Sequence, residues 1–191
     1  MSDTRKRLTR EQRLAQLLEV ARRVIAEEGT DALSLGRLAE AAGITKPTVY
    51  DHFGTREGLL TALYRDFEVR QNLLIDGAMA AGEATLKGKA RAIAESYVDC
   101  VLAEGREIPG VLAALEGSPE LARLKRECQL EFLGKCRVVL GPFAGALSTA
   151  GLWGMLGAAD ALSGAAVAGE IGDEQARGEL FEVIVSLVSR S

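Results

Sequence analysis

Glycine and proline residues divide this sequence of 191 residues into segments, and almost every segment has the apolar periodicity of an α-helix. A strand with one buried face would need apolar and polar residues in alternation, and no stretch sustains that pattern. Apolar residues instead recur at spacings of three and four, which places them on one face of a helix. The sequence therefore predicts an all-α fold.

The first two predicted helices have recognisable ends. Thr9 followed three residues later by Gln12 is a capping-box pattern that begins the first helix, and Gly29 ends it as a left-handed residue. The apolar face between them consists of Leu14, Leu17, Leu18, Ala21, Val24 and Ile25. Ser34 is the expected N-cap of a second helix of two turns, which Gly43 stops.

The third helix is predicted to begin at Lys46, with Thr45 as its cap and Pro47 in its first turn, where proline is tolerated. It closes at Gly54, and Thr55 caps a longer fourth helix. Two short helices joined by a tight turn are typical of a helix-turn-helix. Further helices are predicted over residues 86–104, 119–140, 147–168 and 173–189, with a shorter one near 111–115.

The net charge of −4 and the pI of 5.2 argue against a DNA partner until the charges are located along the chain. Residues 1–70 contain 12 basic and 11 acidic residues, whereas residues 71–191 contain 11 basic and 16 acidic ones. Five basic residues lie within residues 1–13: Arg5, Lys6, Arg7, Arg10 and Arg13. We expect this basic arm to follow a phosphate backbone or enter a minor groove, and the alternative is a solvated tail.

Several protein classes are excluded by composition and by missing motifs. With 48% hydrophobic and 26% charged residues the chain is typical of a globular protein. Residues 1–13 are polar and basic, so we expect no signal peptide. The odd number of cysteines and the lack of an apolar leader indicate a reducing cytoplasm, and the absence of a C-x-x-C pair argues against a zinc knuckle.

No site for metal or catalytic chemistry is evident. His52 is the single histidine, and the sequence has no metal-ligand set, glycine-rich phosphate loop or further candidate base. We therefore expect no metal, no cofactor and no enzymatic activity. The apolar stretch over residues 138–169 is long enough to cross a membrane, but Ala and Gly dominate it, and we interpret it as a packed helix of a protein without a membrane partner.

The predicted third helix has an outward face that is unsuited to a core. On a helical wheel of roughly 100° per residue, Val49, Phe53 and Thr45 point towards the first two helices. The outward arc carries Tyr50, Pro47, Asp51 and Thr48, with Lys46 and His52 at its edges. This mixture of polar groups and rings fits the major groove of DNA, and the alternative is a solvated face.

The outward groups offer definite contacts to DNA. Pro47 and Thr48 can touch thymine methyl groups, and Lys46 can reach guanine acceptors or a phosphate. Tyr50 and His52 can donate hydrogen bonds to backbone oxygens. This part of the chain therefore predicts a DNA-reading helix.

The same region resembles a known DNA-binding domain. It reads LAEAAGITKPTVYDHF over residues 38–53, followed by REGLL over residues 56–60. The tyrosine, histidine and aromatic residue at its end, and the basic residue that opens a leucine-rich helix, are in register with the TetR family of bacterial transcriptional regulators. The resemblance covers residues 9 to about 63. It implies a homodimeric, all-helical repressor whose larger domain binds a small molecule and releases a palindromic operator.

The resemblance and the wheel together assign DNA contacts to Ser34, Arg37, Thr45, Lys46, Pro47, Thr48, Tyr50, His52 and Arg56. Ser34 and Thr45 also begin helices, where amide groups and the helix dipole favour a phosphate. Arg56 stands where the family usually has a lysine, and either residue can contact a phosphate. Two residues depart from the family pattern. Gly36 replaces a longer side chain, and Asp51 either accepts from a cytosine amino group or excludes some sequences.

The expected organisation is a basic arm over residues 1–8, a helix-turn-helix domain over 9–54 and a helical ligand-binding and dimerisation domain over 55–191, with a connecting helix over 55–80. The predicted partners are double-stranded DNA, a second copy and a small-molecule effector, in a bacterial cytoplasm at the nucleoid. Alternatives are a ligand-dependent activator or corepressor-dependent regulator of the same fold, and a helical adaptor that binds another protein.

The second half carries two stripes that favour pairing between copies. Small residues recur at Gly151, Gly154, Ala158 and Ala161, and the last helix has an apolar face that includes Phe181, Ile184 and Val188. We expect an intersubunit four-helix bundle, which resembles the family's dimer interface. The alternative is that both stripes belong to the core of one chain.

For a ligand pocket the sequence offers four candidates, Tyr97, Asp99, Phe132 and Trp153. The cysteines raise a separate hypothesis of redox sensing. Cys128 and Cys136 are eight residues apart on one predicted helix, about 12 Å by helical rise, which is too far for a disulfide. Pairing of Cys100 with either of them, or between copies, remains open.

Overall fold

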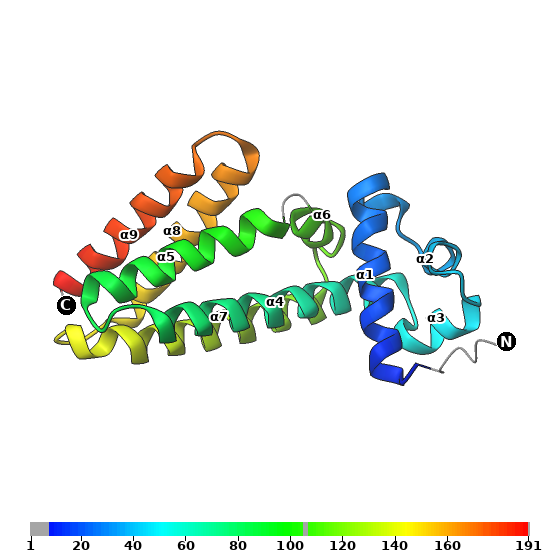
Figure 1. The fold of residues 1–191 in the computed structure, drawn as a ribbon, viewed down its shortest axis with the longest axis horizontal. Coiled ribbons are helices and arrows are strands. Elements are labelled where there is room, and N and C mark those ends of the chain that lie inside the picture. The colour runs from blue at the N-terminus through cyan, green and yellow to red at the C-terminus, as the bar shows by residue number, and fades with distance from the viewer. Residues whose placement is uncertain (1–7, 105–106, 191) are drawn as a thin grey trace, which may run out of the picture. The chain divides into compact units, whose positions relative to one another are not determined.

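The computed structural model describes residues 8–104 and 107–190, and within them it contains helices and no strands, which confirms the all-α prediction (Figure 1). In chain order the elements are α1 (Arg10–Glu28), η1 (Thr30–Ala32), α2 (Leu35–Ala42), α3 (Lys46–Phe53), α4 (Arg56–Ala81), α5 (Leu86–Glu104), α6 (Glu107–Ala114), α7 (Pro119–Leu140), η2 (Gly141–Phe143), α8 (Thr149–Ala168) and α9 (Asp173–Ser189). Arg5, Lys6 and Arg7 of the predicted arm lie outside the described residues.

The chain divides into two compact units. The described residues of the first are 8–67 and 107–118, and those of the second are 68–104 and 119–190. This division differs from the boundary expected at residues 54 and 55, because the beginning of α4 and the whole of α6 belong to the first unit. Leu59, Leu60 and Leu63 of α4 are buried there.

In the first unit, α1 begins after Thr9 and ends at Gly29 as its sequence predicts, and most of its predicted apolar face is buried. Thr9 Oγ1 accepts from the Gln12 amide at 3.1 Å, and Gln12 Oε1 accepts from the Thr9 amide at 3.0 Å, which completes the capping box. Gly29 ends α1 with a φ of 86°, but its ψ of 162° is extended instead of left-handed helical. The buried residues of α1 are Leu17, Leu18, Val20, Ala21, Val24 and Ile25.

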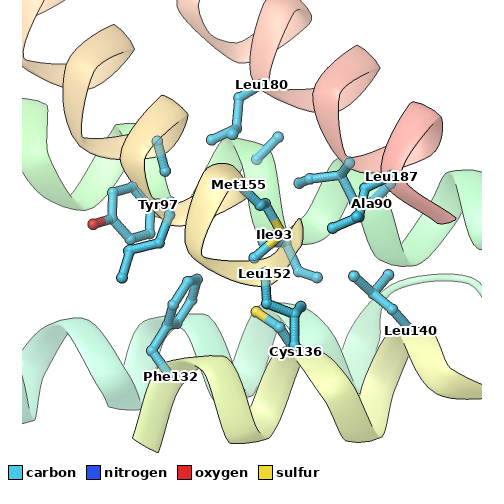
Figure 2. Packing of buried hydrophobic residues seen from close by; sticks show 14 of the residues in the cluster. Ala90, Ile93, Tyr97, Phe132, Cys136, Leu140, Leu152, Met155, Leu180 and Leu187 are labelled. Carbon is cyan, nitrogen blue, oxygen red and sulfur yellow. The ribbon is translucent and has the colours of Figure 1, made fainter. Parts of the chain in front are cut away.

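In the second unit, helices pack around one apolar core. α5 packs against α8 and α9, α8 against α9, and α7 against α8 (Figure 1). Figure 2 shows Ile93, Cys136, Leu152 and Leu180 meeting in this core from four different helices. The later part of α4 is attached to α7 through Lys135 Nζ, which donates to Asp76 Oδ2 at 2.9 Å.

Two helices begin at other residues than predicted. α6 begins at residue 107 instead of near 111, since Pro109 falls in its first turn, where a proline is tolerated. α8 begins two residues late, because Ser148 Oγ accepts from the Gly151 amide at 3.0 Å and caps it. No helix in the part of the chain that the structure describes is long and apolar enough to cross a membrane.

Candidate functional site

α2 and α3 form a helix-turn-helix whose joints are fixed by hydrogen bonds. Ser34 caps α2 as predicted, with its Oγ accepting from the Arg37 amide at 3.0 Å. Gly43 has left-handed backbone, with φ 64° and ψ 35°, and its amide donates to Glu40 O at 3.1 Å. Thr45 is then extended, and α3 begins at the next residue. The turn therefore joins two helices of eight residues each.

α3 has one buried and one exposed face, as the helical wheel predicts. Val49 is fully buried and Phe53 is 9% exposed. On the opposite side Tyr50 is 53% exposed, and Pro47 and Asp51 are exposed too. The side of α3 predicted to read DNA is thus free of the protein's own core.

Thr45 and Thr48 pair with each other at the beginning of α3. Their Oγ1 atoms lie 3.0 Å apart, and the Thr45 side chain makes no capping hydrogen bond to the backbone, contrary to its predicted role. Thr45 is also exposed instead of facing the first two helices, because its extended backbone takes it off the helical wheel. One of the two hydroxyls keeps a proton to donate elsewhere.

Lys46 lies against the first turn of α2. A β-carbon at Gly36 would be 3.7 Å from Lys46 Cε, 3.8 Å from its Nζ and 3.8 Å from Ser34 Oγ. The glycine that departs from the family pattern therefore leaves room for this lysine side chain. An ammonium group, a hydroxyl and the first amides of α2 share this edge, which suits a phosphate oxygen.

The two arginines predicted to contact phosphates are held by the protein itself. Arg37 Nε and Nη2 donate to Oε2 and Oε1 of Glu28, at 3.0 and 2.5 Å. Arg56 Nε and Nη2 donate to the carbonyl oxygens of Leu33 and Thr30, each at 2.8 Å. The hydrogen bond between Glu28 and Arg37 lowers the pKa of the carboxyl and raises the pKa of the guanidinium. No motif in the sequence indicates these partners.

His52 is half-buried near the end of α3, beside positive charge from α1. Burial lowers the pKa of His52, and the charges of Arg10 and Arg13 lower it further, while Asp51 acts in the opposite direction. Arg10 and Arg13, two of the five basic residues counted within residues 1–13, therefore lie within electrostatic reach of α3. This lowered pKa favours the neutral form of His52 in the free protein.

Two of the four ligand candidates meet in the core of the second unit. The ring centroids of Tyr97 and Phe132, both buried, are 5.3 Å apart (Figure 2). The Tyr97 hydroxyl donates to Asp160 Oδ1 at 2.6 Å. Asp160 is missing from the predicted set, although its position as the single charge between residues 138 and 169 is a signal that points to it.

The other two candidates, Asp99 and Trp153, lie apart from this pair. Asp99 Oδ1 accepts from Arg177 Nε at 2.7 Å, and Trp153 lies under the guanidinium of Arg126, whose carbon is 4.3 Å from the ring centroid. Two open grooves of about 350 and 670 Å³ border α5, one towards α9 and one towards the end of α4. Asp99 lines the larger groove, and none of the aromatic candidates lines either.

The residues predicted to pair two copies fall into two sets. Ile184 is fully buried and Val188 is 2% exposed in the core of their own chain, and a β-carbon at Gly151 would be 2.5 Å from Leu187 Cδ1. For Ile184 and Val188 the prediction is corrected, because helices of the same chain already bury them, whereas Gly151 is half-buried. Gly154 and Ala161 are exposed, and Ala158 and Phe181 are half-buried.

The three cysteines are shielded from solvent to different degrees. Cys100 and Cys136 are buried, and Cys128 is half-buried. Burial raises the pKa of Cys136 to about 12, and burial together with Glu68 raises the pKa of Cys128 to about 12. Among the described residues, no group of three or more His, Cys, Asp or Glu side chains is arranged to hold a metal ion.

Comparison with known proteins matches the region just described. The family model for bacterial regulatory proteins of the tetR family covers residues 17–73, from α1 into α4. The transcriptional repressor AcnR of Corynebacterium glutamicum is 40% identical over 55 residues, which are 29% of each chain. The transcriptional activator FasR of Mycolicibacterium smegmatis is 30% identical over 97 residues, 50% of this chain and 43% of that one. The chain thus spans less than half the length of these curated relatives.

The fold as a whole has solved counterparts. A TetR-family transcriptional regulator from Streptomyces coelicolor superposes with a TM-score of 0.74 over 92% of this chain and 94% of that one, at 19% identity. This likeness establishes the arrangement of helices, and the sequence matches identify the helix-turn-helix. Residues 17–73 therefore match the tetR family of bacterial regulatory proteins, and the chain as a whole shares the fold of a solved regulator of that family.

Proposed function

We propose that this protein is a transcriptional regulator that binds a palindromic DNA site as a homodimer and leaves it when a small molecule binds, with repression as its basic mode. The exposed face of α3 carries the proposal. Pro47, Tyr50 and Asp51 project from a helix whose other side, at Val49, is fully buried, so the core fixes the face on which these exposed residues stand. The bacterial cytoplasm is the compartment where such a protein meets its DNA.

Phosphate-binding groups around α3 support the same function. Lys46 and Ser34 share the edge at the first turn of α2, and Arg10 and Arg13 act on His52 at the other end of α3. Contacts on both sides of a reading helix fix its register on the duplex. Because such contacts displace counterions, binding should weaken steeply as salt concentration rises.

The test is fluorescence anisotropy with a labelled duplex from upstream of the protein's own coding region and a scrambled duplex of equal length and composition. We expect affinity for the specific site to exceed that for the scrambled one by at least about 10³-fold at physiological salt. Equal affinity for both would contradict sequence-specific regulation. Absence of binding to any DNA would favour the helical adaptor.

A row of small exposed residues on α8 supports the homodimer. The exposed residues at alternating spacings of four and three are Ala150, Gly154, Gly157, Ala161, Gly164 and Ala168. This is a heptad spacing, and small side chains on it let a second helix approach closely. Analytical ultracentrifugation should show a dimer that Ala161→Arg disrupts, while Ala80→Arg, at an exposed position on α4, leaves it intact.

A cluster of polar and aromatic side chains in the second unit supports release by an effector. Tyr97, Phe132 and Asp160 bring a phenol, a ring and a carboxylate together in the second unit, and such a group can fix a ligand's orientation. A thermal-shift screen of metabolites and antibiotics, followed by anisotropy with each hit, tests it. A stabilising compound that lowers DNA affinity would support release, and one that raises it would indicate a corepressor.

Activation is the second candidate mode, because FasR, the relative with the longer alignment of the two described, is an activator. A reporter gene behind the protein's own promoter distinguishes the modes. Deletion of the regulator should raise expression under repression and lower it under activation.

A further inference from the structure

Arg37 and Glu28 form a two-pronged ion pair between the end of α1 and the first turn of α2. The pair uses Nε and Nη2 of the guanidinium, which donate to the two carboxylate oxygens at 3.0 and 2.5 Å. Glu27 and Glu40 also act on the charge of Arg37, but neither shares a hydrogen bond with it among the described residues. Glu28 therefore determines the direction in which the guanidinium points.

Arg56 is held in the same way by different groups. Its Nε and Nη2 donate to the carbonyl oxygens of Leu33 and Thr30. In both arginines the remaining nitrogen, Nη1, has no hydrogen-bond partner within residues 8–104 and 107–190. A guanidinium has five N–H donors in a rigid plane, so fixing one edge also fixes the other.

The first turn of α2 places Arg37 beside other groups that suit a phosphate. Arg37 follows Gly36, and the space above that glycine is occupied by the end of the Lys46 side chain and by Ser34 Oγ. A long side chain loses conformational freedom when it binds, and holding it in the bound direction beforehand reduces that loss. With its other edge held by Glu28, the Nη1 edge of Arg37 is already oriented to donate to a phosphate oxygen of DNA.

We propose that Glu28 is a positioning residue for DNA binding, which holds Arg37 so that its Nη1 edge is presented to the phosphate backbone. This inference rests on the proposed function. It is opposed by a simple alternative in which Glu28 competes with the phosphate for Arg37 and weakens binding. The two ideas predict opposite signs for the removal of the carboxylate.

The depressed pKa of Glu28 is consistent with this geometry. The hydrogen bond from Arg37 keeps the carboxyl ionised to lower pH than usual, so the pair stays formed throughout the physiological range. DNA binding and positioning therefore operate in the same pH window.

The experiment is a double-mutant cycle of Glu28→Ala and Arg37→Ala, read by anisotropy as a function of KCl concentration. We expect Glu28→Ala to weaken binding about tenfold and to lower the slope of log affinity against log salt by about one, as loss of one phosphate contact does. In the Arg37→Ala background, Glu28→Ala should have no further effect. Glu28→Gln, which keeps one acceptor oxygen for Arg37, should give an intermediate loss.

Glu27→Ala is the matched control. Glu27 is exposed one residue earlier on α1, so its removal changes the charge equally without releasing Arg37, and affinity should stay the same or rise slightly. Circular dichroism melting should show every variant folded, so that an affinity change is a binding effect. A salt slope is a readout that a purely structural role of Glu28 would leave unchanged.

Three results would overturn the inference while leaving the proposed function intact: tighter binding by Glu28→Ala, unchanged binding by Glu28→Ala, or equal losses with and without Arg37. Wild-type protein that binds neither the upstream duplex nor any other DNA would overturn both.

Discussion

Gly110 of α6 lies so close to Thr30 of η1 that a β-carbon on the glycine would be 2.4 Å from the threonine Oγ1. Both residues belong to the first unit, although α6 is joined in sequence to helices of the second on either side. Thr30 also provides a carbonyl oxygen to Arg56. A change at Gly110 therefore reaches the connection between α1 and α2.

The first prediction follows from this close approach. Gly110→Ala should destabilise the protein by about 1–3 kcal/mol, because the added methyl group must displace Thr30. Gly134→Ala is the control, since Gly134 is exposed on α7 with no atom within 4 Å of an added β-carbon. That variant should be more stable by roughly 0.5–1 kcal/mol from helix propensity alone. Thermal unfolding of both variants tests this, and equal stabilities would contradict the packing argument.

The second prediction concerns the two faces of α3. Val49→Ala should lower the free energy of unfolding by about 1–3 kcal/mol, because Val49 is fully buried. Tyr50→Ala should change stability by less than about 0.5 kcal/mol, yet lower affinity for all DNA sequences. Lys46→Ala and Thr48→Ala should alter base preference instead. Urea unfolding and binding-site selection provide the measurements, and operator binding unaffected by Tyr50→Ala, Lys46→Ala and Thr48→Ala would refute the assignment of α3.

The third prediction is a pH dependence centred on His52. Its pKa is lowered in the folded protein by burial and by Arg10 and Arg13, so the unfolded chain binds the proton more readily. The free energy of unfolding is therefore unaffected by His52 above pH 6.5, the ordinary pKa of histidine. It decreases as the pH falls below that value, because the unfolded chain then takes up the proton first. In the complex, DNA phosphates near His52 would favour its protonated form. DNA affinity should therefore increase as the pH is lowered from 8 to 6.

Because the chain has one histidine, NMR can follow His52 without assignment of other imidazole signals. Its pKa should lie below 6.5 in the free protein and increase in the DNA complex. His52→Gln should remove this component of the pH dependence, and Arg10→Ala should raise the pKa of His52 in the free protein. An unchanged pKa on DNA binding would place His52 away from the phosphates.

The fourth prediction is that the cysteines do not sense oxidants. A thiol with a pKa of about 12 is almost entirely protonated at pH 7.5, and the thiolate is the reactive form. Mass spectrometry after brief treatment with iodoacetamide or mild peroxide should find Cys128 and Cys136 unmodified in the folded protein. Modification of either, accompanied by a change in DNA affinity, would restore the redox hypothesis.

Local signals in the sequence were sufficient for most of the fold. The capping box at Thr9, the N-cap at Ser34 and the end of the second helix at Gly43 are decided by residues within one or two turns, and each is present. Membership of a unit depends on contacts between distant segments, and so the association of α6 with the first unit was not predictable from periodicity. The same reason explains why Ile184 was wrongly predicted to lie in a dimer interface. An apolar stripe on a helix is equally compatible with a dimer contact and with the core of its own chain.

For the candidate site, the sequence predicted which face of α3 is exposed but not what the arginines contact. The exposed face of α3 follows from a helical wheel on which Val49 marks the buried side. The partners of Arg37 and Arg56 are a carboxylate and two carbonyl oxygens on the connection between α1 and α2, and their positions depend on its conformation. Short motifs contain no information about such backbone acceptors.

Trp153, the single tryptophan of the chain, is stacked under Arg126 in the second unit. Its indole fluorescence, excited selectively, therefore reports on α7 and α8 alone, while the imidazole protons of His52 report on the other unit. The wild-type protein thus has one native spectroscopic probe in each unit. Titrations with a small molecule and with DNA can be assigned to the unit they perturb without any attached label.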